Sequence, residues 1–324
     1  MLSLTDFILS PPLSPPVPLP QVPGPKLIPF TPTAHADIEF IRNLGRPNDK
    51  DTRVWKVKIN KCGPFALKMF FFNSGEHLER SPGNYLNNHP LAKRQSYVDY
   101  LDPFNCECRA YGRLKQEERE DRAIKAYGYL LITPEQEAEV TRRIEGDPEI
   151  FDELHGSHQV LNGDNTWRRY EQYRGHPIRA IVKQLVSDDA EPFGVADIPH
   201  LWSDLEELHK PGILVRDVHI GKYLGGKLID FSRSWAMYHP CLDRTTPSLL
   251  QEIRQSEAED LFDLLITWFN LNPNEQLAIP ERLDYCVNTL TDDVGYDPRR
   301  YNWRKWEEDV RMADSYIAHE LFKS

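Results

Sequence analysis

The sequence predicts an α+β protein of two lobes, in which a β-rich N-terminal part precedes a helical C-terminal part. Short β-like runs separated by turn residues fill the region from residue 38 to 72. Beyond residue 186, apolar residues recur instead at helical spacing. With 324 residues, of which 40% are hydrophobic, the chain is long enough to bury a sizeable core. The cleft between two such lobes is the default place for a ligand.

Composition excludes several classes of protein. A net charge of -11 argues against a broad nucleic-acid-binding surface, so we expect no direct nucleic-acid partner. We expect no membrane partner either, because no stretch reaches the roughly 18 apolar residues of a membrane span. The five cysteines are an odd number at scattered spacings, which fits reduced thiols in an intracellular protein, cytoplasmic or nuclear.

The first 33 residues read as a proline-rich leader. Ten of the 26 prolines lie in this stretch, which favours polyproline II and a disordered segment outside any core. A docking or phosphorylation role for the Ser-Pro pairs of the leader stays open. We place the N-terminal lobe, with its insertions, at residues 34–186 and the helical C-terminal lobe at residues 187–324.

In the N-terminal lobe, turn residues separate three β-like runs, which predicts a three-stranded meander followed by a helix and two further strands. The region from 133 to 176 is polar and acidic, so it reads as a short helix and an irregular insertion. In chain order, the expected elements are strands over 38–44, 53–59 and 65–72, a helix over 105–121, a strand over 123–132, a helix over 134–144 and a strand over 177–186.

In the C-terminal lobe, a helix over 197–209 carries an apolar stripe and a proline in its first turn. A second helix begins near Ser256, because Ser256 and Glu259 have capping-box spacing before a strongly apolar run. This helix reads as central to the lobe. Two further helices are expected over 276–290 and 300–322.

Residues 208–232 form the segment whose pattern indicates a chemical function. They read as a helix end, a strand, a loop with Arg216-Asp217, a tight Gly-Gly turn and then Asp230-Phe231. This pattern resembles the catalytic core of eukaryotic protein kinases, which implies a two-lobed protein-kinase-like fold and the cofactors ATP and Mg²⁺. The resemblance gives Asp217 the role of the catalytic-loop carboxylate and Asp230 that of the metal ligand. The alternative is that these two Asp residues only cap turns and have no catalytic or metal-binding role.

The same resemblance implies a lysine on the third strand and a glutamate on the following helix. Phe65-Ala66-Leu67-Lys68 resembles the strand motif, so Lys68 is the expected nucleotide-binding lysine. Glu107 is its expected partner on the helix. Asp260 resembles the acid that ties the central helix to the catalytic loop, and an ordinary acid in the first helical turn is an equal alternative.

The departures from the kinase pattern concern activity. The stretch from 44 to 54 holds one glycine where the kinase pattern has three. This departure argues against the binding of phosphates by backbone N–H groups in this stretch. Lys222 stands where the family keeps an asparagine for the second metal ion, so a cation replaces a metal ligand. Lys222 could instead contact a phosphate directly, and it is therefore counted among the cofactor-binding candidates.

Residues 224–235 and 106–114 are more specifically similar to a fungal family of kinase-like proteins that are inner-kinetochore subunits. That resemblance implies a protein partner in a kinetochore or chromatin assembly. One hypothesis is therefore a nucleotide-binding kinase-like protein with degenerate or weak phosphotransfer. The alternative is a catalytically dead pseudokinase scaffold that binds partner proteins. A small-molecule kinase is a third reading, and Lys222 counts against it.

Overall fold

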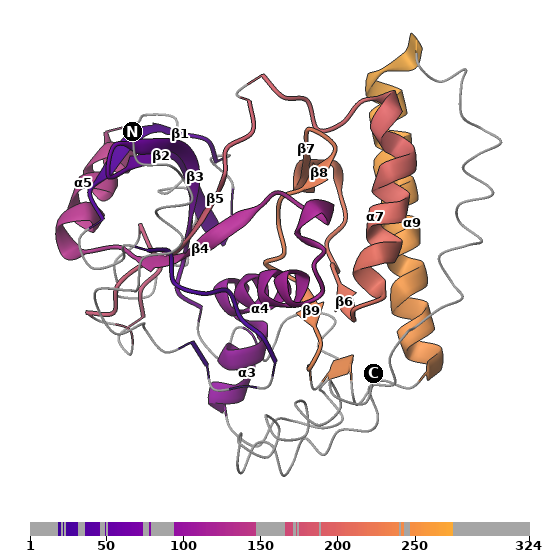
Figure 1. The fold of residues 1–324 in the computed structure, drawn as a ribbon, viewed down its shortest axis with the longest axis horizontal. Coiled ribbons are helices and arrows are strands. Elements are labelled where there is room, and N and C mark those ends of the chain that lie inside the picture. The colour runs from indigo at the N-terminus through magenta and orange to yellow at the C-terminus, as the bar shows by residue number, and fades with distance from the viewer. Residues whose placement is uncertain are drawn as a thin grey trace.

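The computed structural model describes residues 19–20, 22, 24–31, 36–45, 49, 51–73, 78, 94–146, 166–170, 173, 175–187, 189–239, 241–242 and 247–274. Within them, the predicted α+β class is confirmed, since a five-stranded antiparallel sheet is combined with several helices (Figure 1). None of the helices in these ranges combines the length and the apolar character that crossing a membrane requires.

The sheet has the strand order β1-β2-β3-β5-β4. The first three strands form the expected meander, and the two later strands extend it beyond β3 because β5 pairs with β3 and β4 with β5. The strands are β1 (Ile38–Asn43), β2 (Thr52–Ile59), β3 (Cys62–Phe70), β4 (Ala126–Leu131) and β5 (Arg179–Gln184).

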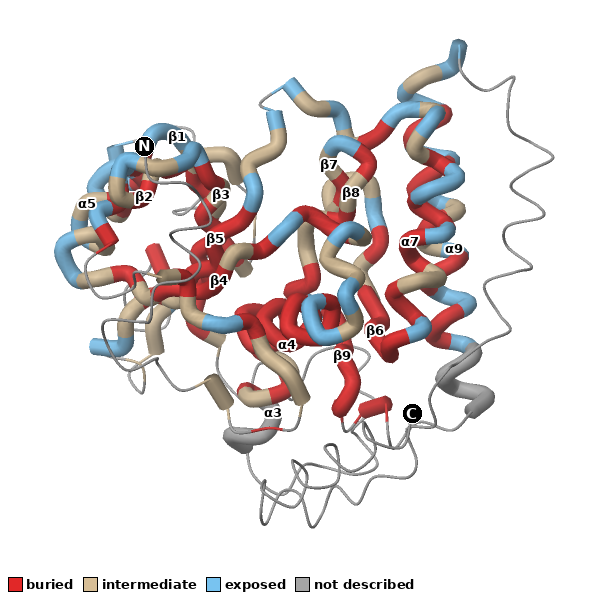
Figure 2. The backbone as a smooth tube through the Cα atoms, viewed as in Figure 1, coloured by how far each residue is buried: buried red, intermediate tan, exposed pale blue. Residues whose placement is uncertain are grey.

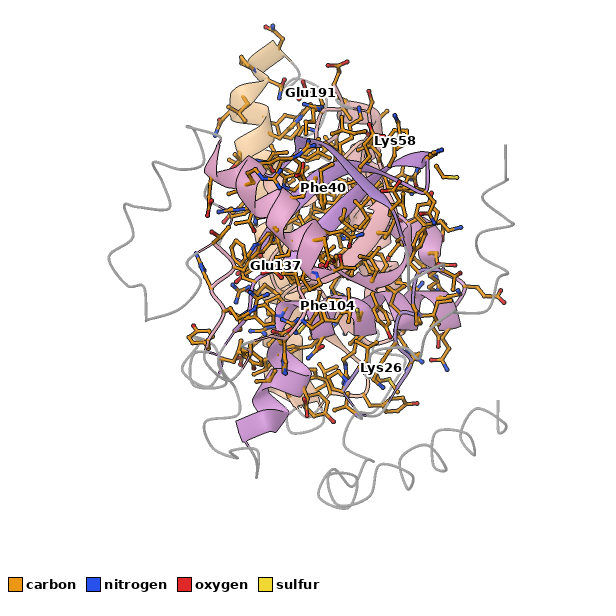
Figure 3. All side chains as sticks on the ribbon, turned by 90° about the vertical axis from the view of Figure 1, so that its left-hand side faces the viewer. Lys26, Phe40, Lys58, Phe104, Glu137 and Glu191 are labelled. Atoms are coloured by element: carbon orange, nitrogen blue, oxygen red, sulfur yellow. The ribbon has the colours of Figure 1, made fainter. Side chains whose placement is uncertain are left out.

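A helix covers each face of this sheet (Figure 3, where Phe104 marks α4 and Glu137 marks α5). Successive side chains of a strand point to opposite faces. In β3, Phe70 therefore packs with α4 (Pro103–Gln116), while Leu67 belongs to the apolar cluster of α5 (Pro134–Glu145). The predicted short helix after residue 133 thus covers the sheet face opposite α4.

Helix α4 is the central helix of the N-terminal part, and it is buried on almost every side (Figure 2). Asp102 caps it by accepting the backbone N–H groups of Phe104 and Asn105, and Pro103 fits the first turn because it needs no N–H acceptor there. Arg179 of β5 pairs with the same carboxylate at 2.8 Å. The cap fixes the start of the helix two residues before the predicted position. The short helix α3 (Arg94–Leu101) precedes it.

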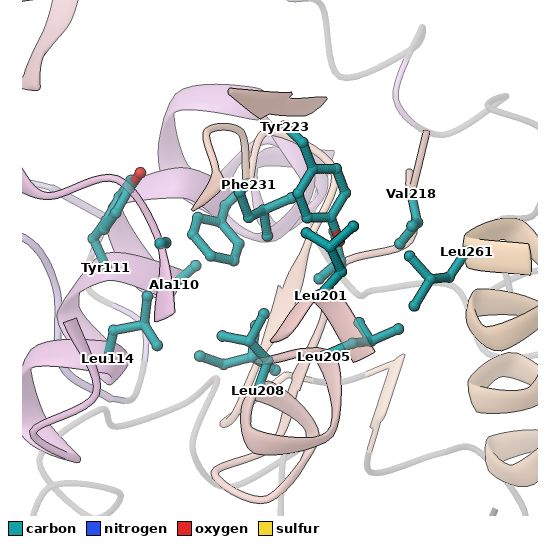
Figure 4. Close-up of a cluster of buried hydrophobic side chains, with 14 of the residues drawn as sticks. Ala110, Tyr111, Leu114, Leu201, Leu205, Leu208, Val218, Tyr223, Phe231 and Leu261 are labelled. Atoms are coloured by element: carbon teal, nitrogen blue, oxygen red, sulfur yellow. The ribbon is translucent and has the colours of Figure 1, made fainter. Parts of the chain in front are cut away.

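The C-terminal part contains the helices α7 (Ile198–His209) and α9 (Pro247–Leu271) and two small two-stranded sheets. Its apolar cluster is continuous with that of α4, since Leu114 and Phe231 belong to the same core as Leu205 and Leu261 (Figure 4). The short strands are β6 (Ile213–Leu214), β7 (Tyr223–Leu224), β8 (Lys227–Leu228) and β9 (Trp235–Ala236). In the part of the chain that the structure describes, 3₁₀ turns cover Val195–Asp197 and Ile220–Lys222, and a further one covers Glu120–Arg122 in the N-terminal part.

Helix α9 begins earlier than expected. The prediction of a helix start at Ser256 is wrong, because residues 247–255 already continue the helix and Ser256 lies in its interior. Leu, Gln, Glu and Arg dominate this stretch, and all four favour a helix. The helices expected over 276–290 and 300–322 lie outside the described residues.

The N-terminal segment also differs from the expected leader. Residues 24–31, here called the N-terminal strap, lie against α4 and β4, and Leu27 and Phe30 are buried. The strap is anchored by its backbone, since the Leu27 N–H donates to the Cys108 carbonyl and the Phe30 N–H to that of Tyr129. Apolar residues between the prolines let the strap join the core. Residues 1–18 of the expected leader lie outside the described residues.

Gly112 and Gly128 leave room for the strap, because a Cβ atom at either would collide with its backbone, and Gly112 provides a test. A Cβ atom at Gly112 would lie 2.5 Å from the backbone of Lys26, closer than real Cβ contacts. We expect Gly112→Ala to destabilise the protein by about 1–3 kcal/mol, despite the better helix propensity of alanine, because the strap must shift. Urea unfolding measures the loss. Gly194→Ala, whose Cβ meets only ordinary contacts, is the control, and equal stability of both variants would contradict the account.

Candidate functional site

The five residues predicted from the sequence come together where the sheet, α4 and the β7–β8 hairpin meet. Lys68 lies on β3, Glu107 on α4 and Asp230 just after β8. The ammonium of Lys68 lies 2.7 Å from Glu107 Oε2 and 2.5 Å from Asp230 Oδ1. Lys68 and Glu107 are buried, while the Asp230 side chain keeps 16% of its surface exposed.

Lys222 occupies the space between the two aspartates. Its Nζ atom lies 2.6 Å from Asp230 Oδ2 and 2.9 Å from Asp217 Oδ2. The 3₁₀ turn Ile220–Lys222 aims the side chain back at the two carboxylates. His219 approaches the other oxygen of Asp217 at 3.6 Å. One ammonium thus bridges both acids.

Lys183 completes the cluster, although the sequence patterns did not predict it. From the inner face of β5 it reaches the second carboxylate oxygen of Glu107, and it donates to the Ile229 carbonyl at 2.7 Å. A lysine directly after the apolar run from Ala180 to Val182 was the available signal, since a buried lysine needs a partner. Strand register alone could not identify that partner.

The cluster is balanced in charge. Three ammonium groups, from Lys68, Lys183 and Lys222, face three carboxylates, from Glu107, Asp217 and Asp230. Burial by itself opposes ionisation of Asp230, but the neighbouring lysines outweigh it and hold the pKa of Asp230 well below its usual value. Burial likewise opposes the charge of Lys222, yet Asp230 and Asp217 raise its pKa above the ordinary lysine value. Both groups therefore stay charged at neutral pH.

This arrangement does not fit a divalent metal ion at Asp230. Each oxygen of that carboxylate already faces an ammonium, and the backbone N–H of Ser232 also donates to it at 2.8 Å. Two unit charges 4 Å apart interact by about 4 kcal/mol at an effective dielectric constant of 20, so an ammonium at that distance would repel a divalent ion by about 8 kcal/mol. Among the described residues, no group of three or more potential metal ligands occurs.

Glu257, not Asp260, links helix α9 to the loop that contains Asp217. The Glu257 carboxylate accepts the backbone N–H of Arg216 at 2.6 Å and meets His209 Nε2 at 2.7 Å. Arg216 has a positive φ of 62°, a conformation that this buried acceptor supports. Asp260 lies one turn further along α9, where burial raises the pKa of its carboxyl group. Neither reading of Asp260 is confirmed, because Glu257 makes the link one turn earlier and Asp260 lies in the interior of α9 instead of in its first turn.

The β1–β2 connection contributes two more acids near the cluster. Asp51 pairs with Arg233 at 2.5 Å, which links this connection to the segment after Asp230. Asp49 is half-buried and interacts electrostatically with Lys68 and Lys222, and burial raises the pKa of its carboxyl group. The β1–β2 connection thus brings a carboxylate near the lysines of the cluster.

The segment after Asp230 is held by a stack of aromatic and cationic side chains. The guanidinium of Arg216 lies 3.7 Å from the ring centroid of Trp235, and Trp235 stacks on His239 at 5.4 Å. His239 in turn meets Tyr100 edge to face, and Arg109 of α4 covers the Tyr100 ring at 4.8 Å. The stack joins the loop of Asp217 to α3 and α4.

His239 is held neutral in this stack, which predicts a pH dependence. Nε2 donates to the Tyr100 carbonyl and Nδ1 accepts the Cys241 N–H, so the neutral ring satisfies both contacts. Burial and then Arg109 lower the pKa of His239 well below its usual value. The unfolded chain thus binds the proton more readily. Below about pH 6.5, stability should fall by up to about 1.4 kcal/mol per pH unit.

Urea unfolding at pH 7.5, 6.5 and 5.5 measures this slope for the wild type and for His239→Gln, which cannot titrate there. We expect a shallower slope between pH 6.5 and 5.5 in the variant. Equal slopes for the two proteins would show that His239 carries its proton in the folded state.

Comparison with known proteins adds one finding. The profile of the family described as kinetochore Sim4 complex subunit FTA2 matches residues 15–235, more than half of the chain. A search of curated proteins gives no match. The matched range contains the N-terminal strap, the whole sheet and all of the clustered lysines and acids. The chain therefore belongs to the kinetochore Sim4 complex subunit FTA2 family.

Proposed function

We propose that this chain is a catalytically inactive, kinase-like scaffold that binds partner proteins within a kinetochore assembly in the nucleus. The observation that carries the proposal is the Lys222 ammonium, which lies between Asp217 and Asp230. Membership of the FTA2 family supports the kinetochore context and the expectation of protein partners.

The kinase-like part of the proposal rests on four positions. A lysine on the third strand pairs with a glutamate on the following helix, as in kinases, and two aspartates follow in the expected order along the chain. The five-stranded sheet with α4 and the mainly helical part after residue 187 support a two-lobed arrangement. The four positions are Lys68, Glu107, Asp217 and Asp230.

The inactivity follows from the same contacts. Phosphoryl transfer needs a carboxylate to hold Mg²⁺ against the phosphates and another to orient the attacking hydroxyl. In this chain, the Lys222 ammonium lies within hydrogen-bond distance of both carboxylates, so it takes the position that the metal ion and the hydroxyl would need. The mutual neutralisation of the cluster makes it a structural link between β3, α4 and the β7–β8 hairpin.

A second candidate function is a nucleotide-binding protein with weak phosphotransferase activity that uses ATP and Mg²⁺. The ion pair of Lys68 and Glu107, at 2.7 Å, supports this candidate, because kinases use such a pair to orient the lysine that binds the nucleotide phosphates. Asp217 would then orient the hydroxyl and Asp230 would bind the metal. Lys222 would have to leave both acids first.

The test combines assembly and catalysis. The purified chain is mixed with the other subunits of the Sim4 complex, and co-elution in size-exclusion chromatography is compared for the wild type and Asp217→Asn. The scaffold proposal predicts equal co-elution and no transfer of labelled phosphate from Mg²⁺-ATP to any subunit or to a generic protein substrate. Phosphate transfer that Asp217→Asn abolishes would establish the second candidate instead.

A further inference from the structure

Helix α9 presents one face to solvent along most of its length. Its inner face packs in the core through Leu261 and Leu265, and exposed and buried stretches alternate along the helix (Figure 2). Residues that are three and four apart lie on the same side of a helix. The exposed residues with this spacing, here called the outer face of α9, are Glu252, Ser256, Glu259, Asp263, Ile266 and Asn270.

The outer face has an apolar end. Ile266 keeps 42% of its surface exposed, and Phe262, one turn before it, is half-buried. Leu271, directly after Asn270, keeps 69% of its surface exposed. A segment that covers this end of α9 would therefore remove apolar surface from water, which is favourable.

The outer face is also negatively charged. In the part of the chain that the structure describes, no base forms an ion pair with Glu252, Glu259 or Asp263, and Glu259 accepts the amide N–H of Gln255 at 3.0 Å. Glu259 and Asp263 stand four residues apart, a spacing at which like charges destabilise a helix. Burial and then the neighbouring acids raise the pKa of the Asp260 carboxyl group. A cationic occupant of this face would relieve the repulsion.

The C-terminal segment of the same chain has the complementary chemistry. It lies outside the described residues, at the start of the helix expected over 300–322. Its cations and tryptophans are Arg299, Arg300, Trp303, Arg304, Lys305 and Trp306. Arginine pairs well with carboxylates, and tryptophan covers a large apolar area.

The connection between the two segments is long enough. The described part of the chain ends at residue 274, three residues after α9, so residues 275–298 form the tether. An extended chain spans up to about 3.5 Å per residue, whereas a helix rises only about 1.5 Å per residue, so this tether reaches any point of α9. Tethering also raises the local concentration of the segment to the millimolar range.

We propose that residues 299–306 dock on the outer face of α9 within the same chain. The arginines of this segment pair with Glu259 and Asp263, and its tryptophans cover the apolar end of the face at Ile266. While it is docked, the segment keeps other proteins off this face, so docking regulates the access of partners to α9. The family profile matches residues 15–235, so α9 and the segment both lie beyond the matched range.

Hydrogen–deuterium exchange of the full chain tests the proposal. In the wild type, we expect residues 300–322 to exchange more slowly than a synthetic peptide of the same sequence. The double variant Glu259→Gln, Asp263→Asn should speed their exchange by about fivefold, the effect expected for the loss of two exposed ion pairs. The same double variant removes a like-charge repulsion within α9, so with an empty outer face α9 itself would exchange no faster. Exchange of the sheet in the same samples reports whether each variant is folded.

The matched control is the double variant Glu39→Gln, Glu145→Gln, which removes two exposed acids from the N-terminal part. It should leave the exchange of residues 300–322 unchanged.

A charge exchange and a dilution series identify the occupant. Arg300→Glu with Arg304→Glu, and Glu259→Arg with Asp263→Arg, should each speed the exchange of the segment, and the combination of all four should slow it again. Slow exchange that is lost on dilution would identify a second copy of the chain as the occupant. Exchange as fast as in the synthetic peptide would leave the face open to a partner protein. Either result, or equal exchange in the wild type and in Glu259→Gln, Asp263→Asn, would overturn the proposal and leave the scaffold function untouched.

Discussion

Replacement of Glu107 by alanine should lower the free energy of unfolding by about 3–5 kcal/mol, the usual cost of removing one partner from a buried ion pair. The Glu107 side chain has no exposed surface, and it faces the ammonium groups of Lys68 and Lys183. Without the carboxylate, the Lys183 ammonium keeps the Ile229 carbonyl and the face of the Tyr111 ring, but it loses the acid that is paired with it. Two buried positive charges then lie close together without the acid between them. Urea unfolding at neutral pH measures the loss.

The matched control is Glu39→Ala, which removes an acid from an exposed pair with Lys58 and should cost no more than about 1 kcal/mol. A second variant identifies the cause of the loss. Adding Lys183→Met to Glu107→Gln removes the surplus ammonium, so the double variant should be more stable than the sum of the two single losses predicts. A loss below about 1 kcal/mol in Glu107→Ala, or strict additivity, would contradict the charge-balanced cluster.

Lys222→Asn should create a binding site for Mn²⁺ or Mg²⁺ that the wild type lacks. The change removes the ammonium between Asp217 and Asp230 and supplies an amide oxygen, so three oxygen ligands converge where a cation stood. Removal of the Lys222 ammonium abolishes its repulsion of a divalent ion, which amounts to several kcal/mol at an effective dielectric constant of about 20. We therefore expect Mn²⁺ affinity to rise by about 100-fold or more, equivalent to about 2.7 kcal/mol.

Electron paramagnetic resonance of free Mn²⁺ measures this gain, because bound ions lose the sharp signal of the aqueous ion. Lys58→Asn, at the exposed pair with Glu39, is the control for an added asparagine. If the wild type and Lys222→Asn titrate Mn²⁺ alike, Lys222 does not exclude the metal, and the explanation of inactivity fails.

The strands and the clustered acids follow from local sequence patterns. Alternation and turn residues were sufficient to place β1, β2 and β3, and the kinase resemblance placed Lys68 and Asp230 on the elements that the structure shows. The kinase resemblance also predicted Glu107 from its place in the helix after the strand lysine, and the structure pairs it with Lys68. These positions depend on spacing along the chain, which a sequence displays directly.

The remaining features depend on which segments meet in space. The partner of Lys183 comes from α4, and that of the Arg216 N–H comes from α9, so neither spacing nor propensity could reveal them. The N-terminal strap was assigned to a leader by its prolines, although its burial depends on the room that Gly112 leaves beside Lys26. In that segment, the proline content predicted disorder, but packing against the rest of the protein determines the structure.

The most direct test of the central claim, that an ammonium takes the place of the metal, is a crystal structure of the wild type grown with Mn²⁺ and ATP. We predict no anomalous manganese peak beside Asp230, with the Lys222 ammonium still within hydrogen-bond distance of Asp230 and Asp217. An anomalous peak at coordination distance from Asp230, with Lys222 turned away, would contradict the account and establish a metal-dependent nucleotide site.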